Sequence, residues 1–410
     1  MSHDSPPVDP SHADVHVIGG GLGGLAAAAL VARAGRSVTV HEGRGRLGGR
    51  ATTDSKDGYR FNQGPHALYL AGEGHRVLRA FGIAPSGTAP NTKGARMVRD
   101  GQVGLAPGDP VSLLRSSVLG WRDKVALAGV LNRIDRLDPA TLGSVTTGEW
   151  VDDLSPRARV REIIHTVIRL GTYVNAPDVL SADVALMQVQ LALGDGVIYL
   201  DRGWEQLVDA LAAVEGITVV RDEPVRELPD ARCVIVATGA PSSVTALTGQ
   251  RFDELGPSAD VSVLDIGLTT PPTHDVVLGI DPPMYLSNHG FPAGMTPAGR
   301  SSMSVAEYLA PDTAPDRERL RAFLTHAGVA PESVETERYL HRMTAVTAIS
   351  TAAAGGLRRR PDGVVPDRAG VFVVGDWVGR RGHLLDAVLA SAEDAARNAV
   401  AHLDRQPSVR

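Results

Sequence analysis

The stretch DVHVIGGGLGGLAAAALVARAGRSVTVHEGRGRLGGR, residues 14–50, decides how this chain folds. Its apolar residues 15–18 predict a short buried strand, and the Ala- and Leu-rich residues 22–34 predict a helix that a glycine ends. A second strand is predicted over residues 37–41, directly before Glu42. Strand, helix, strand and acidic residue in this order predict a βαβ unit in an α/β fold of the Rossmann, dinucleotide-binding type.

Three glycines in this stretch have separate physical roles. Gly19 permits a tight turn out of the first strand, Gly21 leaves room for a pyrophosphate, and Gly24 lets the helix pack closely on the strand. The start of the helix adds free N–H groups and the positive end of its dipole. Glu42 can accept hydrogen bonds from a ribose diol, and its charge disfavours a 2′-phosphate there. The stretch therefore predicts a site for NAD or FAD rather than for NADP.

The residues that follow separate these two cofactors. EGRGRLGGR, residues 42–50, resembles the E-A-x-x-R-x-G-G-R signature of the superfamily of FAD-dependent amine oxidases, protoporphyrinogen oxidases and phytoene desaturases. FNQGPHALY, residues 61–69, is similar to the segment that this superfamily lays along the flavin. The resemblance implies FAD-binding roles for Glu42, Arg44, Gly49, Arg50, Gly64, Pro65 and His66.

A middle segment, residues 197–240, resembles the part of the superfamily in which a glycine turn leads into a helix and a strand. There the resemblance implies that the backbone of Val225 contacts the adenine end of FAD.

A C-terminal segment, residues 370–403, combines a buried strand, the pair Gly375-Asp376 and a long helix. The resemblance implies that Asp376 interacts with the pyrophosphate–ribityl region of FAD. It also implies that the helix, starting at Leu384 and Leu385, points its positive end at the flavin, where it would stabilise negative charge on the reduced ring.

The resemblance also divides the chain into parts. An FAD-binding domain in three segments is expected to carry an inserted α+β substrate-binding domain, behind a short disordered tail. The expected ranges are 1–13 for the tail, 14–70, 197–245 and 365–405 for the FAD-binding domain, and 71–196 and 246–364 for the substrate-binding domain.

The bulk properties limit the class of protein. With 410 residues, 43% of them hydrophobic, and a net charge of −6, the chain suits a globular enzyme and not a nucleic-acid-binding protein. The one cysteine, Cys233, lies in an apolar run, far from the C-terminal cysteine that tethers flavin in some superfamily members, so FAD is expected to be non-covalent. No apolar run could span a membrane, and residues 1–13 lack the pattern of a signal peptide, so a cytoplasmic location is expected. No feature specifies an oligomeric state.

Two stretches can be interpreted either as ordinary structural elements or as contact surfaces for a ligand or a membrane. Residues 111–137 predict helices with apolar faces that include Leu114 and Val125, with Arg and Lys between them. They form either a packed helix pair, which is favoured, or a lip that touches a membrane or lipid substrate peripherally. The basic run at residues 358–360 is expected to be a solvated loop, with an anionic contact as the alternative. No Cys/His cluster has metal-ligand spacing, so no metal is predicted.

The resemblance implies that substrate hydride passes directly to flavin N5, so no acid–base residue needs to be visible. The candidates for residues beside the flavin are His66, Trp377 and His383. For each histidine a purely structural hydrogen-bonding role is the favoured alternative.

Two departures from the superfamily narrow the reaction. Many of its amine oxidases use a lysine late in the chain, but the lysines here are Lys56, Lys93 and Lys124. Aromatic residues make up only 4%, which leaves little material for an aromatic cage around an amine. We therefore expect a desaturase-like dehydrogenase that takes hydride from a C–C or C–N bond of a small or apolar, isoprenoid- or lipid-like substrate. The alternatives are an amine oxidase using O2, a redox-neutral isomerase using reduced flavin, and a non-catalytic flavin-binding scaffold.

Overall fold

The structure, a computed structural model, describes residues 12–405, so residues 1–11 of the tail expected to be disordered lie outside the described part. A five-stranded parallel sheet contains the predicted βαβ unit. Its order is β10-β2-β1-β11-β17, which is 3-2-1-4-5 when the strands are counted along the chain, as in a Rossmann-type fold. The strands are β1 (Val15–Ile18), β2 (Val38–His41), β10 (Ile217–Val220), β11 (Val234–Val236) and β17 (Val371–Val373).

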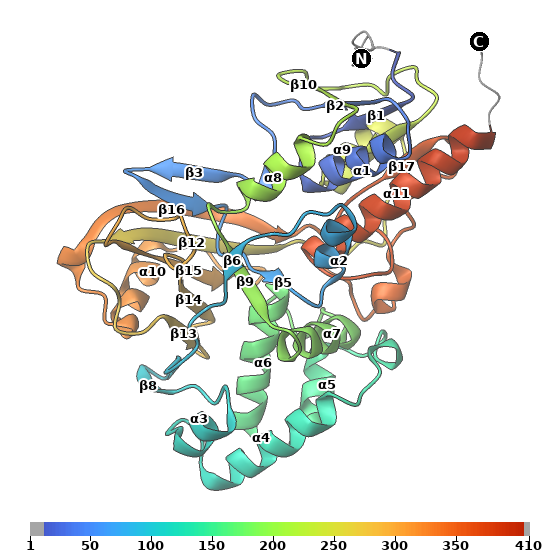
Figure 1. The fold of residues 1–410 in the computed structure, drawn as a ribbon. Helices are drawn as coiled ribbons and strands as arrows, with labels where there is room; N and C mark the ends of the chain where they lie inside the picture. The colour runs from blue at the N-terminus through green and yellow to red at the C-terminus, as the bar shows by residue number, and fades with distance from the viewer. Residues whose placement is uncertain (1–11, 406–410) are drawn as a thin grey trace.

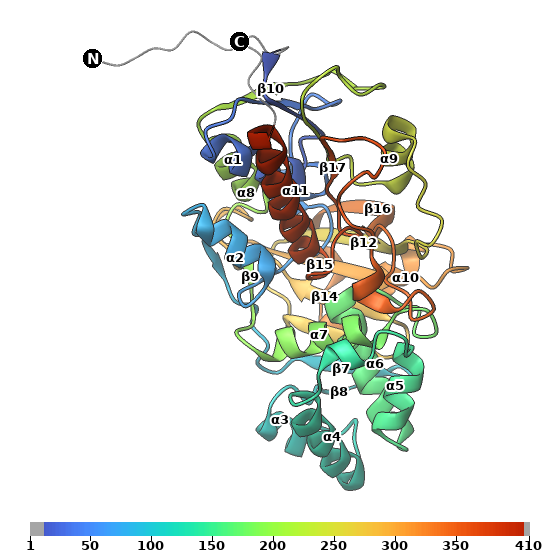
Figure 2. The ribbon, with the colours of Figure 1, turned by 90° about the vertical axis from the view of Figure 1, so that its right-hand side faces the viewer.

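Small side chains let two helices pack tightly on this sheet. The helix α1 (Leu22–Arg33) buries a row of alanines, and α11 (Leu385–Arg405) runs along it (Figure 2). A Cβ atom at Gly23 would lie 2.8 Å from a methyl group of Val388, so only glycine permits this approach. The predicted Rossmann-type domain, assembled from separate segments, is confirmed. The helix α8 (Glu205–Ala212) packs on the same core.

Two helices shift the expected boundaries of this domain. The helix α2 (Glu73–Ala80), assigned to the substrate part because it follows residue 70, instead packs on α11, and Val77 and Leu78 belong to the core of the parallel sheet. The helix α9 (Pro241–Thr248), for which no helix was expected, buries Val244 against β11 and β17. The packing thus extends both segments beyond residues 70 and 245.

A seven-stranded sheet forms the second region, with the order β16-β12-β15-β14-β13-β7-β8. All neighbours are antiparallel except β13 and β7. The apolar runs at residues 261–270, 276–281, 283–288 and 301–310 are typical of strands and form β12 to β15, whereas charged residues interrupt the apolar alternation of the longest strand, β16. The strands are β7 (Arg96–Arg99), β8 (Gln102–Leu105), β12 (Ala259–Leu268), β13 (Val276–Gly279), β14 (Met284–Asn288), β15 (Ser301–Tyr308) and β16 (Val334–Val346), and α10 (Arg317–Phe323) packs on the sheet.

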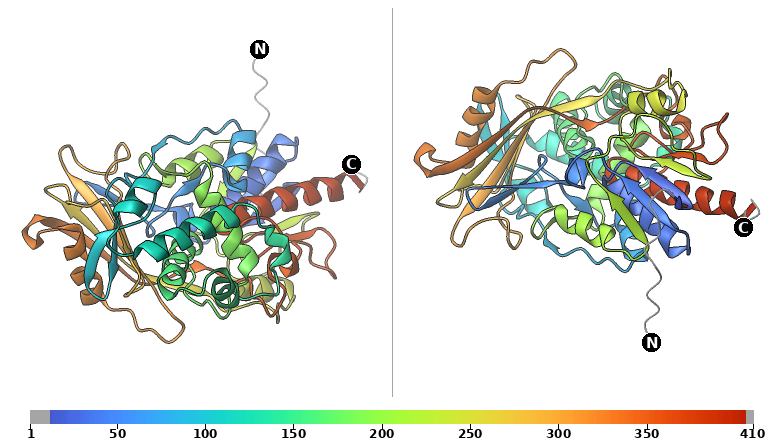
Figure 3. Two further views of the ribbon diagram at one scale, coloured as in Figure 1. Left: turned by 90° about the horizontal axis from the view of Figure 1, so that it is seen from below. Right: turned by 90° about the horizontal axis from the view of Figure 1, so that it is seen from above.

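Short strands connect the two sheets, which lie at opposite ends of the views in Figure 3. One hairpin follows the Rossmann βαβ unit, and β9 pairs with two strands from the N-terminal quarter of the chain. These strands are β3 (Thr53–Lys56), β4 (Tyr59–Asn62), β5 (Leu68–Tyr69), β6 (Gly87–Thr88) and β9 (Val197–Leu200).

A helical region completes the molecule and lies at the bottom of Figure 1. Its helices are α3 (Pro110–Arg115), α4 (Trp121–Ile134), α5 (Thr147–Leu154), α6 (Ala158–Thr172) and α7 (Ala182–Leu193). The expected apolar face of the first two is only partly right, since Leu127 and Ile134 are buried but Leu114 is 74% exposed and Val125 is 66% exposed. Among the described residues, no helix combines the length and apolarity needed to cross a bilayer.

Candidate functional site

The glycine turn after β1 is closed at two positions and open at the third. A Cβ atom at Gly19 would lie 2.6 Å from the Ala237 carbonyl oxygen, and one at Gly24 would lie 1.9 Å from the Gly19 oxygen. At Gly21 the nearest atom would be the Gly48 oxygen, at 4.0 Å. Gly21 is also the N-cap of α1, which has no side-chain cap. The turn thus presents uncapped helix N–H groups next to open space, as a pyrophosphate requires.

The acidic residue lies at the end of β2 and is held by backbone N–H groups. One oxygen of Glu42 accepts a hydrogen bond from Gly20 at 2.8 Å, and the other accepts one from Arg44 at 2.9 Å. Each carboxylate oxygen keeps a second lone pair, so Glu42 can still accept from a diol. The turn before Val225 pairs with this segment, because Glu223 N–H donates to the Glu42 carbonyl. Glu42, Arg44 and the Val225 loop therefore lie together.

The N-terminal and C-terminal segments of the FAD-type domain meet at Asp376. Arg50, from the N-terminal signature, lies 3.1 Å from this buried carboxylate, which also accepts hydrogen bonds from the Thr347 amide at 2.8 Å and hydroxyl at 2.6 Å. Although burial alone would raise it, the pKa of Asp376 is lowered by Arg50 and by the Thr347 donors. Behind it, Gly375 N–H lies 3.2 Å from the Ser391 hydroxyl of α11. Asp376 is therefore a fixed anion that joins three segments.

The neighbouring candidate, Trp377, is buried in an apolar cluster. Its ring is fully buried in the cluster of β11, β17 and α9, packs against Phe252 at 4.7 Å, and donates to the Gly239 carbonyl at 2.7 Å. These contacts occupy both its ring and its N–H, and a place of Trp377 beside the flavin stays a prediction. The expectation of a solvated basic loop is corrected at one position, since buried Arg360 donates to the Asp376 carbonyl at 2.7 Å.

The start of α11 is a strained turn beside a buried histidine. Leu384 has a φ of 51°, the left-handed region, and α11 begins at Leu385. His383 Nε2 donates to the Thr172 carbonyl at 2.9 Å, and burial lowers its pKa to about 4. His383 is thus neutral at pH 7, and its contact anchors α11 to the end of α6. This geometry supports the structural role for His383.

The segment Gly64-Pro65-His66 lies against the seven-stranded sheet, since a Cβ atom at Gly64 would come within 3.5 Å of Val263 in β12. His66 Nδ1 donates to the Gly64 carbonyl at 2.8 Å, so the neutral ring leaves Nε2 as an acceptor. Burial lowers the pKa of His66 to about 4, and its ring lies 4.8 Å from that of Trp204. His66 is therefore a neutral acceptor rather than a cation.

Next to this segment lies a group of residues that the sequence did not single out. Five of the seven tyrosines come from β5, β9, β14, β15 and the end of α6 and converge in the interior. We call Tyr69, Tyr173, Tyr199, Tyr285 and Tyr308 the tyrosine cluster. A small total of aromatic residues thus still places five aromatic side chains together, which composition alone does not reveal.

Direct contacts join the tyrosine cluster to the Gly64-Pro65-His66 segment. Tyr173 donates to the Pro65 carbonyl at 2.5 Å and packs edge-on against Tyr308 at 5.8 Å. The hydroxyl of Tyr199 lies 2.6 Å from that of Tyr285, and its ring stacks on His289 at 4.1 Å. Burial is the main cause that raises the pKa values of these phenols, and burial also lowers the pKa of His289 to about 3. The cluster is therefore aromatic and uncharged at neutral pH.

The residues of the glycine turn fit a flavin dinucleotide. Besides the open face of Gly21, the buried hydroxyl of Thr238 at the end of β11 has no hydrogen-bond partner in the structure. It lies beside the turn, because a Cβ atom at Gly19 would come within 3.3 Å of the Thr238 amide. Buried hydroxyls without a partner are unusual, so this one is available to a ligand.

The sequence of this chain is similar to those of curated oxidoreductases. Flavin-containing monoamine oxidase AofH, so named in Mycobacterium tuberculosis strain H37Rv, is 28% identical over 327 residues, which cover 74% of this chain and 66% of that protein. Phytoene desaturase of Cercospora nicotianae is 36% identical over 118 residues, covering 26% of this chain and 18% of that protein. The chain thus aligns with less than two thirds of the length of these curated relatives.

Solved structures share the fold over nearly the whole chain. Cyclohexylamine oxidase from Brevibacterium oxydans has a TM-score of 0.69 at 18% identity, with 96% of this chain and 100% of that chain covered. Putrescine oxidase bound to putrescine has a TM-score of 0.71 at 17% identity, with 95% and 99% covered. The model of the family described as flavin containing amine oxidoreductase matches residues 22–261, more than half of the chain. The chain belongs to this flavin containing amine oxidoreductase family.

Proposed function

We propose that this protein is an FAD-dependent oxidoreductase. It would oxidise a C–N or C–C single bond of a small, neutral substrate by removing hydride from one of the bonded carbons. The observation that carries the proposal is the uncharged tyrosine cluster beside Gly64-Pro65-His66. Bound flavin would supply the hydride acceptor. The chain's own residues would bind the substrate among aromatic rings, exclude water and offer His66 Nε2 as a hydrogen-bond acceptor.

The cofactor part of the proposal rests on the nucleotide end of the site. Gly19, Gly21 and Gly24 would hold the pyrophosphate at the start of α1, Glu42 the ribose, and Arg50 with Asp376 the central part of FAD. FAD would be non-covalent, because the single cysteine, Cys233, is buried in the parallel sheet. Acid precipitation tests this, since it should release all the yellow colour into the supernatant.

The substrate part is favoured by the state of charge of the cluster. Raised phenol pKa values and lowered histidine pKa values leave neutral rings, which suit an apolar molecule or an unprotonated amine. The aromatic side chains of the cluster therefore favour C–N oxidation, which the sequence analysis ranked second. The absence of a late lysine still favours C–C dehydrogenation. In both reactions a C–H bond would break and its hydride would pass to the flavin. They differ in the bond formed: C=N in amine oxidation, or C=C in dehydrogenation, which also requires the adjacent carbon to lose a proton to solvent.

Anaerobic bleaching of the bound flavin tests the reaction. The purified holoprotein would be mixed, without oxygen, with primary and secondary amines and with isoprenoids in micelles, and absorbance at the flavin band followed. Bleaching by either group supports the proposal and selects between C–N and C–C oxidation; peroxide release in air would then identify an oxidase. Bleaching by no compound contradicts it. Turnover only with pre-reduced flavin would indicate the isomerase, and tight FAD without turnover the scaffold.

A peripheral membrane contact is a second proposal, because one apolar patch is exposed. The α3–α4 patch consists of Val111, Leu114, Trp121 and Val125. Lys124 Nζ donates to the Leu114 carbonyl at 2.6 Å, which holds the two helices together, and Arg122 stacks on Trp121 at 5.5 Å. Large apolar side chains with nearby cations suit an anionic lipid surface.

Vesicle sedimentation tests the α3–α4 patch. We expect the protein to sediment with vesicles of anionic phospholipid, and the double substitution Leu114→Ser, Trp121→Ser to reduce the bound fraction at least fivefold. Leu193→Ser, at an exposed apolar residue at the end of α7, is the control and should bind normally. Equal binding by all three proteins would contradict a contact through this patch.

A further inference from the structure

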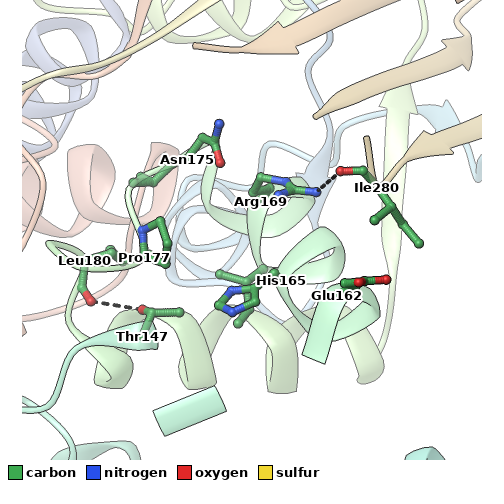
Figure 4. A pocket seen from close by; sticks show the side chains of 10 residues that line it. Thr147, Glu162, His165, Arg169, Asn175, Pro177, Leu180 and Ile280 are labelled. Atoms are coloured by element: carbon green, nitrogen blue, oxygen red, sulfur yellow. Dashed lines mark hydrogen bonds between the residues drawn. The ribbon is translucent and has the colours of Figure 1, made fainter. Parts of the chain in front are cut away.

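A cavity of about 190 Å³ lies in the helical region, outside the nucleotide end of the site. It is bounded by one face of α6, by the chain between α6 and α7, and by Ile280 just after β13 (Figure 4). Two of its lining residues bond directly to members of the tyrosine cluster. Tyr173 N–H bonds to the Arg169 carbonyl one turn earlier on α6, and Asn175 Nδ2 donates to the Tyr308 carbonyl at 3.0 Å. The cavity therefore adjoins the tyrosine cluster without belonging to it.

Arg169 in this cavity is a cation without a counter-ion. Its guanidinium donates to the carbonyls of Ile280 at 3.2 Å and Gly279 at 3.4 Å and to the Thr166 hydroxyl at 3.1 Å, all neutral acceptors. Its Nε is buried without a hydrogen-bond partner, and within residues 12–405 no carboxylate forms an ion pair with it. Asp281 acts on it only at longer range. An inward-facing guanidinium that lacks an anion is costly, and an anionic ligand would remove that cost.

The other ionisable groups around the cavity do not supply the missing charge. Glu162 lines it, but both of its oxygens are taken by Arg99, at 2.7 and 3.2 Å. His165 is kept neutral because burial, and then the nearby Arg169, lower its pKa. The lining groups, taken with the Arg99 that pairs with Glu162, therefore carry one net positive charge, and Asp281 forms no direct ion pair with Arg169.

The rest of the lining sets the kind of anion. Ile168, Val174, Leu180 and Ile280 are aliphatic, so most of the surface suits a hydrocarbon body. A cavity of about 150 Å³ can hold a benzene ring, and this one has room for that ring and a carboxylate. Arginine matches a carboxylate through charge-assisted hydrogen bonds, so Arg169 is the group that would hold it.

We propose that the Arg169 cavity binds a small organic acid, with its carboxylate on Arg169 and its apolar body of benzoate size against the aliphatic wall. The site is distinct from the nucleotide end and needs no flavin. Its ligand would lie behind Tyr173 and Tyr308, on the side opposite Pro65.

Isothermal titration of the flavin-loaded protein with benzoate tests the site, with neutral benzamide as the matched ligand. We expect measurable binding of benzoate and at least tenfold weaker binding of benzamide. Arg169→Met should weaken benzoate binding at least tenfold. Arg161→Met is the control, since this arginine of the same helix pairs with Asp152 instead, and it should leave binding unchanged.

A second variant distinguishes ligand binding by Arg169 from a purely structural role of this residue. Ile280→Trp keeps the guanidinium but fills the cavity, and it should abolish benzoate binding while the thermal midpoint stays that of the wild type. The inference fails if benzamide binds as tightly as benzoate, or if either variant retains wild-type affinity. It also fails if benzoate shifts the flavin absorption spectrum in Ile280→Trp as in the wild type, because the acid would then lie at the flavin.

Discussion

The nucleotide end and the tyrosine end of the candidate site are built in opposite ways. The nucleotide end is mostly backbone, contributed by a glycine turn and an uncapped helix within a few adjacent residues. The tyrosine end is made of side chains from five separate elements, which meet only when the seven-stranded sheet, the short strands β5 and β9, and α6 are in place. A backbone site tolerates almost no change at its glycines, whereas a side-chain site can be altered one contact at a time. This difference also explains what the sequence could reveal.

The largest expected effect separates ligand binding from folding within the glycine turn. Gly21→Val should abolish flavin binding, because its side chain enters the open space at the start of α1, yet leave the unfolding free energy of the apoprotein within about 0.5 kcal/mol. Gly24→Ala should instead destabilise the apoprotein by about 3 kcal/mol, since its Cβ would overlap the Gly19 oxygen. Flavin absorbance per protein and urea unfolding measure the two effects. Full flavin occupancy in Gly21→Val would contradict the assignment of the nucleotide end.

The next largest effect concerns the link between the two ends. Arg338 of β16 pairs with buried Asp265 at 2.7 Å and with Asp54 of the β3–β4 hairpin at 2.8 Å. Arg338→Met should cost about 3–5 kcal/mol, because Asp265 is left buried without a counter-ion. Arg342→Met is the control on the same strand, where the exposed pair with Asp260 should contribute less than about 1 kcal/mol. Equal losses in urea unfolding would show that the Arg338 network is not the link.

The sequence predicted the fold and the nucleotide end because both depend on neighbouring residues. The glycine spacing, the apolar strands and the Asp376 turn are local patterns, and they fixed the Rossmann-type domain. The tyrosine cluster has no such pattern, since its members are separated by up to hundreds of residues and none sits in a motif. Strand β16 was missed for a related reason: Arg338 is a charged residue that faces inward, where it meets Asp265, so the alternation of the strand is hidden. Likewise, the exposure of Leu114 depends on what the rest of the chain leaves uncovered.

A smaller effect, dependent on pH, tests the charge that joins the chain ends. The pKa of Asp376 is lowered in the folded state, so its ionised form contributes stability above the unfolded pKa of about 3.9 and loses it as the pH falls through the lower folded value. Asp376→Asn should therefore cost about 2 kcal/mol at pH 7 and clearly less at pH 3. Asp404→Asn, which removes an exposed partner of Arg36, should show no such dependence. A pH-independent loss in urea unfolding of Asp376→Asn would rule out the ionic role.

The smallest effect distinguishes two members of the tyrosine cluster. The Tyr199 hydroxyl bonds to Tyr285 and to Ser287, at 2.6 and 2.7 Å, whereas the buried hydroxyl of Tyr308 has no hydrogen-bond partner in the structure. Tyr199→Phe should therefore lower the unfolding free energy by about 1 kcal/mol, and Tyr308→Phe should leave it unchanged or raise it slightly, because an unsatisfied polar group is removed. Both variants should keep full flavin occupancy, since neither touches the glycine turn. If either loses flavin in the absorbance assay, the two ends are coupled through side chains, and the contrast between a backbone site and a side-chain site does not hold.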